Sequence, residues 1–449
     1  MPKRSSRSAW RLLSVMWRRR RSTHLDRQLS VLNRRIATGV GAVLLGLVAL
    51  GFAKAGDWAQ HLFAQVVAAW PYAPLLLTPA VFAGVMYLTG RWTPDARGSG
   101  IPQVIAASRS PQESALGPLV SPRTAIAKFA LTISMLFAGG SVGREGPTVQ
   151  ISAALMVAVH RVLRVPITAG VLIAGGAAGV AAAFNTPLAG VAFAIEELAS
   201  AYEQKVAVLV MAAVMIAGLV SLGIAGDYVY FGAMRQMLDV GTMLVVCPVA
   251  GVVGGAAGGL FTKAVLAFAS PKHPLLKRLR SRPVLFAGGC GLVVAVTGIL
   301  THGDTWGTGY GATRALVEGG GATLWFGPAK ALATLATTLG GTPGGIFAPS
   351  LAVGAGVGNL LTPVFPGSPA GAVVLLGMAA YFTGVVRAPL TAVIIISEAT
   401  ASRGMIVPLF ATALIADGVS SLVSRERLYH GLARAFLPKA ERSATESST

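Results

Sequence analysis

Two glutamates could carry charge chemistry in this chain, because both lie in largely apolar surroundings where an ionised carboxylate is costly. Glu145 stands in the motif GREGP, and Glu197 is the second member of a Glu-Glu pair. Parts of the chain recur at an offset of 202 residues, and this repeat places Phe347 opposite Glu145 and Ala399 opposite Glu197. Acids carried by only one half are candidates for function, whereas acids carried by both are candidates for scaffold.

The repeat is clearest in two segments that align without a gap, Phe184–Leu198 (FNTPLAGVAFAIEEL) and Val386–Thr400 (VRAPLTAVIIISEAT). The alignment pairs Glu196 with Glu398, so we expect this shared pair to serve the scaffold. Two apolar halves with Gly- and Pro-interrupted segments at matching places are typical of transporters built from repeats, whose substrate site lies at those interruptions.

Three glycine-rich interruptions could bind an anion: Gly98–Pro102 (GSGIP), Gly143–Pro147 (GREGP) and Gly344–Pro349 (GGIFAP). In each, glycine permits a sharp turn and proline suits the first turn of a helix. The sequence therefore predicts three helix N-termini, each with unpaired N–H groups and the positive end of a helix dipole. Ordinary Gly/Pro kinks are the alternative for any one of them. A phosphate-binding P-loop is excluded, because none ends in Gly-Lys-Ser/Thr.

The elements that position these residues are predicted to be membrane-spanning helices. Of the 449 residues 54% are hydrophobic and 12% are charged, about half the charged fraction of a soluble protein. One span needs about 20 apolar residues, so the longest apolar stretches must contain a break. The stretches are Ile36–Ala53, Ala73–Leu88, Ile167–Ile195, Val206–Ala225, Met243–Ala269, Val284–Leu300, Ala370–Ile396 and Ile406–Val423. Glycines in Gly170–Gly179 and Gly251–Gly259 predict close helix packing.

The net charge of +20 invites a nucleic-acid partner, but basic residues gather in the first 35 positions and in the loop around residues 272–282. That distribution is typical of cytoplasmic segments under the positive-inside rule. We expect contact with membrane lipid, through an amphipathic helix within residues 1–35, and no nucleic-acid partner. Scattered histidines and two cysteines in apolar segments predict buried thiols, no metal site and no cofactor. The lack of a nucleophile motif argues against an enzyme.

GSGIP, GREGP and GIFAP, in this order, resemble the three signature motifs of the CLC chloride channels and chloride/proton antiporters. The resemblance continues through FNTPLAGVAFAIEE and RAPLTAVIIISE and covers Arg35–Phe436. It implies an all-α polytopic homodimer, each subunit with two inverted repeats of tilted and broken helices. The expected organisation is a basic segment (1–35), a first transmembrane repeat (36–237), a second transmembrane repeat (238–423), and a last helix with a polar tail (424–449).

The resemblance also implies where the anion binds: side-chain hydroxyls would face it from two sides and backbone N–H groups from the helix N-termini. The implied anion-binding residues are Ser99, Gly100, Gly146, Ile346, Phe347, Ala348 and Tyr429. For Tyr429, an interfacial aromatic near a membrane end is the alternative. Chloride is the expected anion, because nitrate-preferring relatives tend to carry proline where this chain has Ser99.

By the same resemblance Glu145 is the gate and the external proton-transfer group. An ionised carboxylate at a helix N-terminus can take the place of the anion, and protonation releases it; a helix-capping carboxylate is the alternative. Glu197 would be the internal proton-transfer group of an antiporter, since the channels of this family carry a non-acidic residue there. Solvated acids at a helix end, and a passive gated chloride channel, are the alternatives.

Further expectations concern charges around the site and the location of the protein. Lys128 and Arg144 are expected to tune the potential near the gate, and Arg387 and Glu398 to form a buried pair. Chloride and protons are the expected substrates of a multi-pass protein in a bacterial inner membrane, with both termini cytoplasmic.

Overall fold

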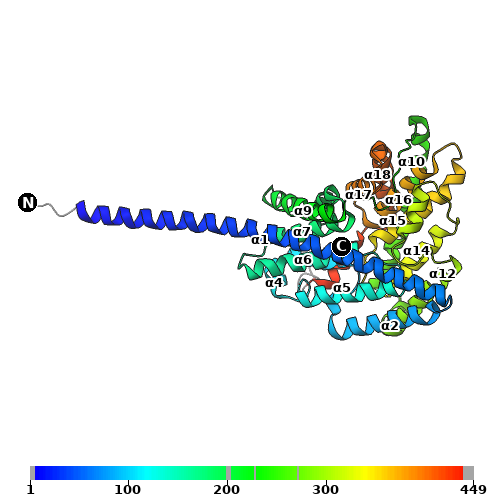
Figure 1. Ribbon diagram of the computed structural model, residues 1–449, viewed down its shortest axis with the longest axis horizontal. Helices are drawn as coiled ribbons and strands as arrows, with labels where there is room; N and C mark the ends of the chain where they lie inside the picture. Colours follow the sequence, from blue (N-terminus) through cyan, green and yellow to red (C-terminus); the bar gives the residue numbers. More distant parts are fainter. Residues whose placement is uncertain (1–5, 199–203, 227–228, 271–272, 438–449) are drawn as a thin grey trace, which may run out of the picture.

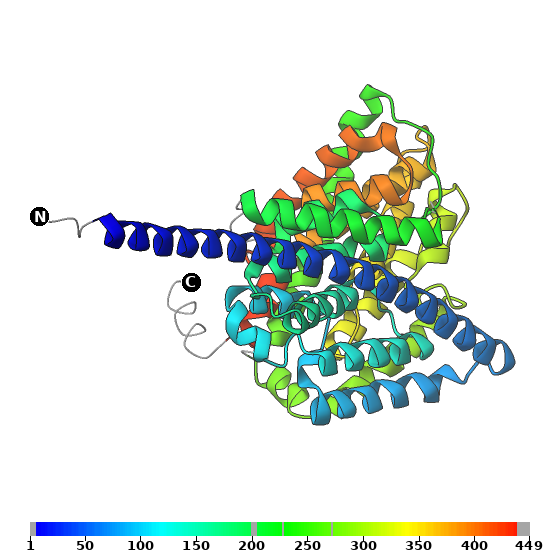
Figure 2. The same ribbon diagram turned by 60° about the vertical axis from the view of Figure 1, so that its left-hand side comes forward.

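The computed structural model describes residues 6–198, 204–226, 229–270 and 273–437 and is built from helices (Figures 1 and 2). α1 (Ser6–Ala69) is one continuous helix whose N-terminal part projects from the bundle and whose remainder runs across it, so the expected boundary after residue 35 falls inside α1. The side chains of residues 1–30, and hence most of the predicted amphipathic face, lie outside the described residues, as does most of the polar tail.

The remaining helices are connected by short segments. The first half of the chain forms α2 (Pro74–Trp92), α3 (Ile101–Arg109), α4 (Pro111–Leu116), α5 (Pro122–Phe137), α6 (Glu145–Val162), α7 (Ala169–Phe184), α8 (Pro187–Phe193), the single π-helical turn η2 (Ala194–Leu198) and α9 (Gln204–Ala225). The second half forms α10 (Val240–Ala269), α11 (Pro274–Arg280), α12 (Pro283–Leu300), α13 (Tyr310–Val317), α14 (Phe326–Leu339), α15 (Phe347–Leu361), α16 (Ala370–Val386), α17 (Pro389–Ala399), α18 (Ile406–Val423) and α19 (Leu428–Ala433).

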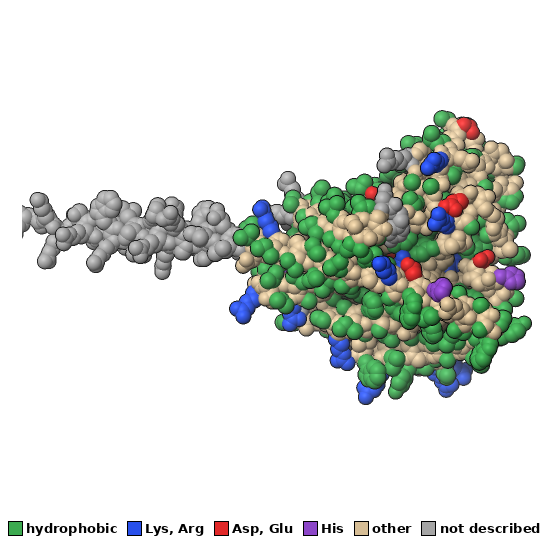
Figure 3. Space-filling model, viewed as in Figure 1, with side chains coloured by type: hydrophobic (Ala, Val, Ile, Leu, Met, Phe, Trp, Pro, Cys, Tyr) green, Lys and Arg blue, Asp and Glu red, His purple; other side chains and the backbone are tan. Residues whose placement is uncertain are grey.

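Several helices have the length and apolar composition of a membrane span. Within the described residues six segments qualify: Val31–Ala69, Ala207–Ala225, Val240–Ala269, Pro283–Leu300, Phe347–Val364 and Ile406–Val423. Hydrophobic side chains cover much of the face drawn in Figure 3, and charged side chains on it are few. Such a face suits contact with lipid rather than water, so the chain is a multi-pass membrane protein.

The helix breaks predicted in the longest apolar stretches are confirmed in two of them and wrong in the third, Met243–Ala269, which lies within the unbroken helix α10 (Val240–Ala269) with Pro248 accommodated inside it. Ile167–Ile195 divides at Asn185 into α7 and α8, and Ala370–Ile396 divides at Arg387 into α16 and α17. Both dividing residues adopt the left-handed conformation, with φ of 57° and 60°, which ends a helix by turning the chain. The repeat therefore reproduces backbone conformation as well as sequence.

Glu196 and Glu398 hold the two repeats together through reciprocal contacts at helix N-termini. The Glu196 carboxylate accepts hydrogen bonds from the Leu390 N–H (2.9 Å) and the Thr391 N–H (2.7 Å) of α17. Glu398 in turn accepts a hydrogen bond from the Ala189 N–H of α8 (3.3 Å). Each carboxylate satisfies donors that a helix leaves unpaired in its first turn, which is the scaffold role expected of the shared pair.

Glu196→Gln is expected to destabilise the protein. The substitution replaces charge-assisted acceptance from three donors, two N–H groups and the Thr391 hydroxyl, each such bond contributing about 1.5–3 kcal/mol. Thermal unfolding of the purified protein measures the loss. Glu398→Gln is the matched control and should lower the melting temperature less, because the hydrogen bond from the Ala189 N–H to Glu398 (3.3 Å) is longer than those that Glu196 accepts. An unchanged melting temperature in Glu196→Gln would contradict the scaffold role.

The expected buried pair between Arg387 and Glu398 is wrong. Arg387 donates to Asp417 of α18 (3.1 Å), whereas Glu398 faces the N-terminus of α8. The left-handed backbone at Arg387 turns its side chain away from α17 and toward the neighbouring α18.

Glycines allow the central helices to approach closely. A Cβ on Gly258 of α10 would come 2.6 Å from the backbone of Gly384 on α16, and one on Gly354 of α15 would come 2.6 Å from Met378. These contacts confirm the close packing predicted for Gly251–Gly259 and bring α10, α15 and α16 against one another. Both cysteines are buried free thiols, as predicted.

Candidate functional site

The three glycine-rich interruptions meet at one place, and each is followed by a helix as predicted. Gly143 and Gly345 exchange backbone hydrogen bonds of 2.7 Å in both directions, and the Gly344 N–H donates to the Gly98 carbonyl (3.1 Å). The exchanged pair joins equivalent residues of the two repeats in antiparallel orientation, as a local two-fold axis requires. α3, α6 and α15 start from this junction, at Ile101, Glu145 and Phe347. Their N-termini therefore lie close together.

The first interruption depends on glycine at two positions. Gly98 has φ of 60° and Gly100 has φ of 107°, in the left-handed region that side chains other than glycine rarely adopt. Gly100 also lies against the Gly146 carbonyl and the Gln150 side chain, where a Cβ would come within 2.9 Å. This backbone exposes Ser99 between two glycines.

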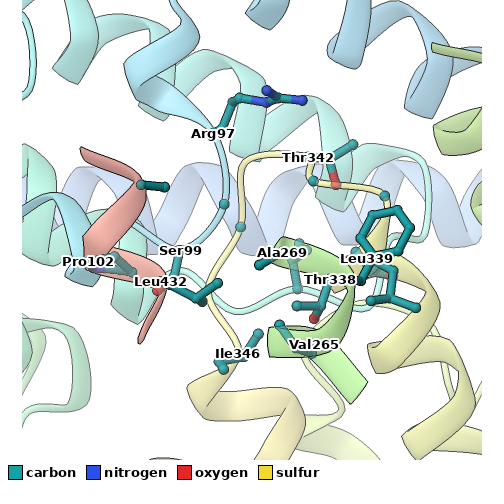
Figure 4. Close-up of a pocket in the computed structure, with 18 of the residues that line it drawn as sticks. Arg97, Ser99, Pro102, Val265, Ala269, Thr338, Leu339, Thr342, Ile346 and Leu432 are labelled. Atoms are coloured by element: carbon teal, nitrogen blue, oxygen red, sulfur yellow. The ribbon is translucent and has the colours of Figure 1, made fainter. Parts of the chain in front are cut away.

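A cavity of about 210 Å³ opens beside the junction (Figure 4). Three predicted anion-binding residues line it: Ser99, Ile346 and Tyr429. The Ser99 and Tyr429 hydroxyl oxygens are both enclosed and lie near each other, and neither makes a hydrogen bond of standard geometry among the described residues. Two neighbouring buried hydroxyls in one cavity can turn toward a bound ligand. Tyr429 is fully buried, which excludes the interfacial alternative.

The other four predicted anion-binding residues lie behind this lining. Gly100 and Gly146 stand at or near the starts of α3 and α6, and Phe347 and Ala348 form the first turn of α15. The buried Phe347 ring packs on Tyr429, with ring centroids 5.9 Å apart. These four residues form part of the backbone at the junction, and none of them is among the residues that line the cavity.

Two arginines line the cavity, and a buried lysine lies behind its wall. Arg97 and Arg280 line the cavity itself. Lys128, expected near the gate, instead donates to the carbonyls of Arg97 (3.3 Å) and Gly98 (2.7 Å) and so supports the first interruption from behind. The positive charges of Arg97 and Arg280 favour an anionic ligand in the cavity over a cation.

Glu145 is fully buried in the first turn of α6. The Tyr310 hydroxyl of α13 donates to its Oε1 atom. Its Oε2 atom makes no hydrogen bond of standard geometry among the described residues and lies beside Gly143, near Ala348 and Pro349 of α15. The carboxylate therefore lies at the junction where α6 and α15 both begin, near the backbone of Glu145 itself and of Ala348.

Arg144 is not among the residues that line the cavity. Its guanidinium donates to Asp57 (2.8 Å), which is 60% exposed, and to the Tyr230 hydroxyl (3.1 Å). The same guanidinium lies 5.6 Å from the ring centroids of Tyr230 and Tyr310, within the range of a cation–π contact. Arg144 therefore links the buried Glu145 region to a solvent-exposed acid.

Glu197 is also buried, at the π-helical turn η2, so it is not a solvated acid at a helix end. The Nδ1 atom of His430 on α19 lies 3.2 Å from its Oε1 atom. The His430 side chain is 34% exposed, whereas its Nδ1 atom is enclosed. His430 thus separates the buried acid from solvent.

Sequence reasoning missed three residues of this site: Tyr310, His430 and Lys330. Lys330 falls on Lys128 in the 202-residue offset, so the repeat held the signal for it. Lys330 donates to the carbonyls of Thr305 (2.9 Å) and Gly307 (2.8 Å), as Lys128 does to its own loop. Tyr310 and His430 reach the glutamates across helices far apart in sequence, and no local pattern marks them.

Comparison with known proteins agrees with this arrangement. The family described as "Voltage gated chloride channel" matches residues 80–421. The protein named "H(+)/Cl(-) exchange transporter ClcA" from Yersinia pseudotuberculosis serotype IB (strain PB1/+) is 30% identical over 445 residues, covering 91% of this chain and 88% of that protein. The same name, identity and coverage hold for the protein from Yersinia pestis bv. Antiqua (strain Angola).

Solved structures share the fold. The crystal structure of a slow cyanobacterial Cl-/H+ antiporter superposes with a TM-score of 0.74 at 23% identity, covering 91% of this chain and 99% of that chain. A CLC-type fluoride/proton antiporter gives a TM-score of 0.74 at 22% identity, covering 89% of this chain and 96% of that chain. The match over most of the sequence establishes that this chain belongs to the voltage gated chloride channel (CLC) family.

Proposed function

We propose that this protein exchanges chloride for protons across a membrane. The observation that carries the proposal is the placement of the two glutamates that the repeat does not share. Both are buried, Glu145 at the start of α6 beside α15 and Glu197 at η2 beside His430 of α19, and both are near enough to the cavity-lining Tyr429 to interact with it electrostatically. Relatives similar over nine-tenths of the chain carry the name of an H(+)/Cl(-) exchange transporter, which favours an exchanger over a channel.

In the proposed mechanism chloride binds between the Ser99 and Tyr429 hydroxyls and the N-termini of α6 and α15. Partial charges from backbone N–H groups and neutral hydroxyls contact the anion, and the Arg97 and Arg280 guanidinium groups that line the same cavity add positive charge. Glu145, when ionised, occupies the N-terminal region of α15 in place of an anion. When a proton neutralises it, the carboxyl group leaves and chloride takes its place, so that one group couples the two substrates.

Glu197 provides the second proton station of the proposed exchange. The Glu197 carboxyl group is buried, and burial disfavours the charged form of a carboxyl group. Its location beside the partly exposed His430 gives protons a path that does not pass through the anion-binding cavity. Protons and chloride would then share only the Glu145 end of the pathway.

Tyr429→Phe and Ser99→Ala are expected to weaken chloride binding by about tenfold each, because each removes one hydroxyl that donates to the anion. Ser99→Pro is expected to shift the selectivity of anion binding toward nitrate. Tyr429→Ala is expected to weaken chloride binding and also to loosen the coupling between chloride and proton transport. Isothermal calorimetry with chloride and nitrate measures the affinities. Tyr381→Phe is the matched control, since Tyr381 is a buried tyrosine of α16 outside the cavity lining. Unchanged chloride affinity in Tyr429→Phe would remove that hydroxyl from the site.

The same proposal covers the membrane location and the oligomeric state of the protein. We place the protein in the inner membrane of a bacterium, with both termini cytoplasmic, as a homodimer of subunits that each carry the two repeats at 36–237 and 238–423. Exposed aliphatic side chains along α9 and α18, among them Val208, Leu219, Val407 and Leu422, supply apolar faces for lipid or a second subunit. Cross-linking in native membranes tests the dimer.

Reconstitution into liposomes tests the exchange itself. A chloride gradient imposed across vesicles that contain the protein, with the same pH on both sides, should drive protons across the membrane and build up a pH gradient, recorded with a pH electrode. Chloride flux with no uphill proton movement would support the passive channel instead.

A further inference from the structure

The chain contains a fourth glycine-rich interruption, separate from the three motifs. It comprises Gly307–Gly309 and leads directly into α13, which begins at Tyr310. Gly307 and Gly309 have φ of 62° and 83°, like Gly98 and Gly100 in the first motif. The Lys330 ammonium binds carbonyls of this loop just as the Lys128 ammonium binds those of the first, and the two lysines are equivalent in the repeat. The loop is therefore the second repeat's counterpart of GSGIP, and Tyr310 follows its last glycine.

Tyr310 does not line the cavity that Ser99 lines; its hydroxyl donates to Glu145 Oε1 instead. The ring is fixed from several sides, with centroids 5.2 Å from Tyr230 and 5.3 Å from Phe231, and the Arg144 guanidinium 5.6 Å away. A hydroxyl on a ring held in this way has little freedom, so the position of the donor is set before the carboxylate arrives.

We infer that Tyr310 is a positioning residue that latches the Glu145 carboxylate in the place from which it excludes the anion. The inference rests on the proposed function of Glu145 as the gate. A hydroxyl that donates to a carboxylate stabilises the ionised form more than the protonated form, because charge-assisted hydrogen bonds are the stronger ones. The latch therefore holds while Glu145 is charged and weakens when a proton arrives.

Other charged or titratable groups around the carboxylate do not replace this latch. Arg144 is committed to Asp57, Tyr230 and the Ala53 carbonyl. Tyr429 is near enough to interact electrostatically with Glu145 but lines the cavity. Lys330 is bound by loop carbonyls. Among the described residues Tyr310 is the side chain that makes a hydrogen bond to Glu145.

If Tyr310 holds the Glu145 carboxylate in place, the Tyr310–Glu145 hydrogen bond should oppose the binding of chloride. Tyr310→Phe keeps the ring and removes the donor, so the carboxylate is held less firmly and chloride should bind about tenfold more tightly at neutral pH. In a Glu145→Ala background no carboxylate competes, and adding Tyr310→Phe should leave chloride affinity unchanged. Calorimetry on the wild type, both single variants and the double variant closes a thermodynamic cycle. Tyr381→Phe serves as the control for loss of a buried hydroxyl elsewhere.

A merely structural role for Tyr310 gives a different pattern. It would change affinity equally in the presence and absence of Glu145, and that result, or an unchanged affinity in Tyr310→Phe, would overturn the latch. Failure of the gate itself is distinguishable, because Glu145→Ala alone would then leave chloride affinity and proton coupling at wild-type values. Melting temperatures of the four proteins, measured in parallel, verify that each is folded.

Discussion

Glu145→Gln is expected to carry chloride but almost no protons. Glutamine has the shape of the protonated gate and cannot release a proton, so proton movement should fall by about 100-fold, the lower end of what a positioned proton-transfer group contributes. In the wild type, chloride flux should rise as the pH falls, because protonation releases the carboxylate from the N-terminal region of α15. In the variant this dependence should flatten. Parallel recordings with a chloride electrode and a pH electrode measure both fluxes.

The control for this variant is Glu113→Gln, which changes a surface acid of α4. Its fluxes and pH profile should match those of the wild type. If Glu145→Gln still moved protons in a fixed ratio to chloride, the buried carboxylate beside Tyr310 would be structural, and the anion site would operate without it.

Glu197→Gln is expected to abolish proton transport while chloride transport persists. The amide cannot bind and release protons, and the proton path past His430 would end at it, so we expect a loss of proton flux of about 100-fold. Chloride does not pass this residue in the proposed mechanism, since the side chain lies outside the cavity lining. Chloride affinity should therefore remain at the wild-type value.

Glu196→Gln provides the matched control, because the two glutamates are neighbours with different contacts. Glu196 binds the N-terminus of α17 and Glu197 does not. The expected pattern is crossed: Glu197→Gln loses proton flux and keeps its melting temperature, whereas Glu196→Gln loses stability and keeps proton coupling in the molecules that fold. If Glu197→Gln transported protons at the wild-type rate, the proposed proton path through Glu197 would be refuted.

The repeat made much of the architecture predictable. Matching sequence positions gave matching helix starts at Glu145 and Phe347 and matching left-handed residues at Asn185 and Arg387. The repeat also distinguished the two neighbouring glutamates: the shared Glu196 was expected to serve the scaffold, and its carboxylate does accept hydrogen bonds from α17 of the other repeat. Local sequence was sufficient here because glycine, proline and helix N-termini act within a few residues.

Contacts between distant helices could not be predicted in the same way. The loop before Tyr310 has no proline and lies out of the register that relates the other segments, so it escaped the comparison of the two halves. His430 meets Glu197 because α19 folds back on the first repeat. Arg387 pairs with Asp417 because its backbone conformation redirects its side chain, and residue type alone does not specify that direction.

The most direct test of obligatory exchange is the membrane potential at which net proton movement stops. Proteoliposomes held at a fixed proton gradient are clamped to a series of potentials with potassium and valinomycin, and the measurement is repeated at several chloride gradients. Exchange predicts that the potential of zero proton flux shifts with the chloride gradient, and that the shift disappears in Glu197→Gln together with the proton flux. A potential that stays at the proton equilibrium value whatever the chloride gradient would contradict coupled transport by this protein.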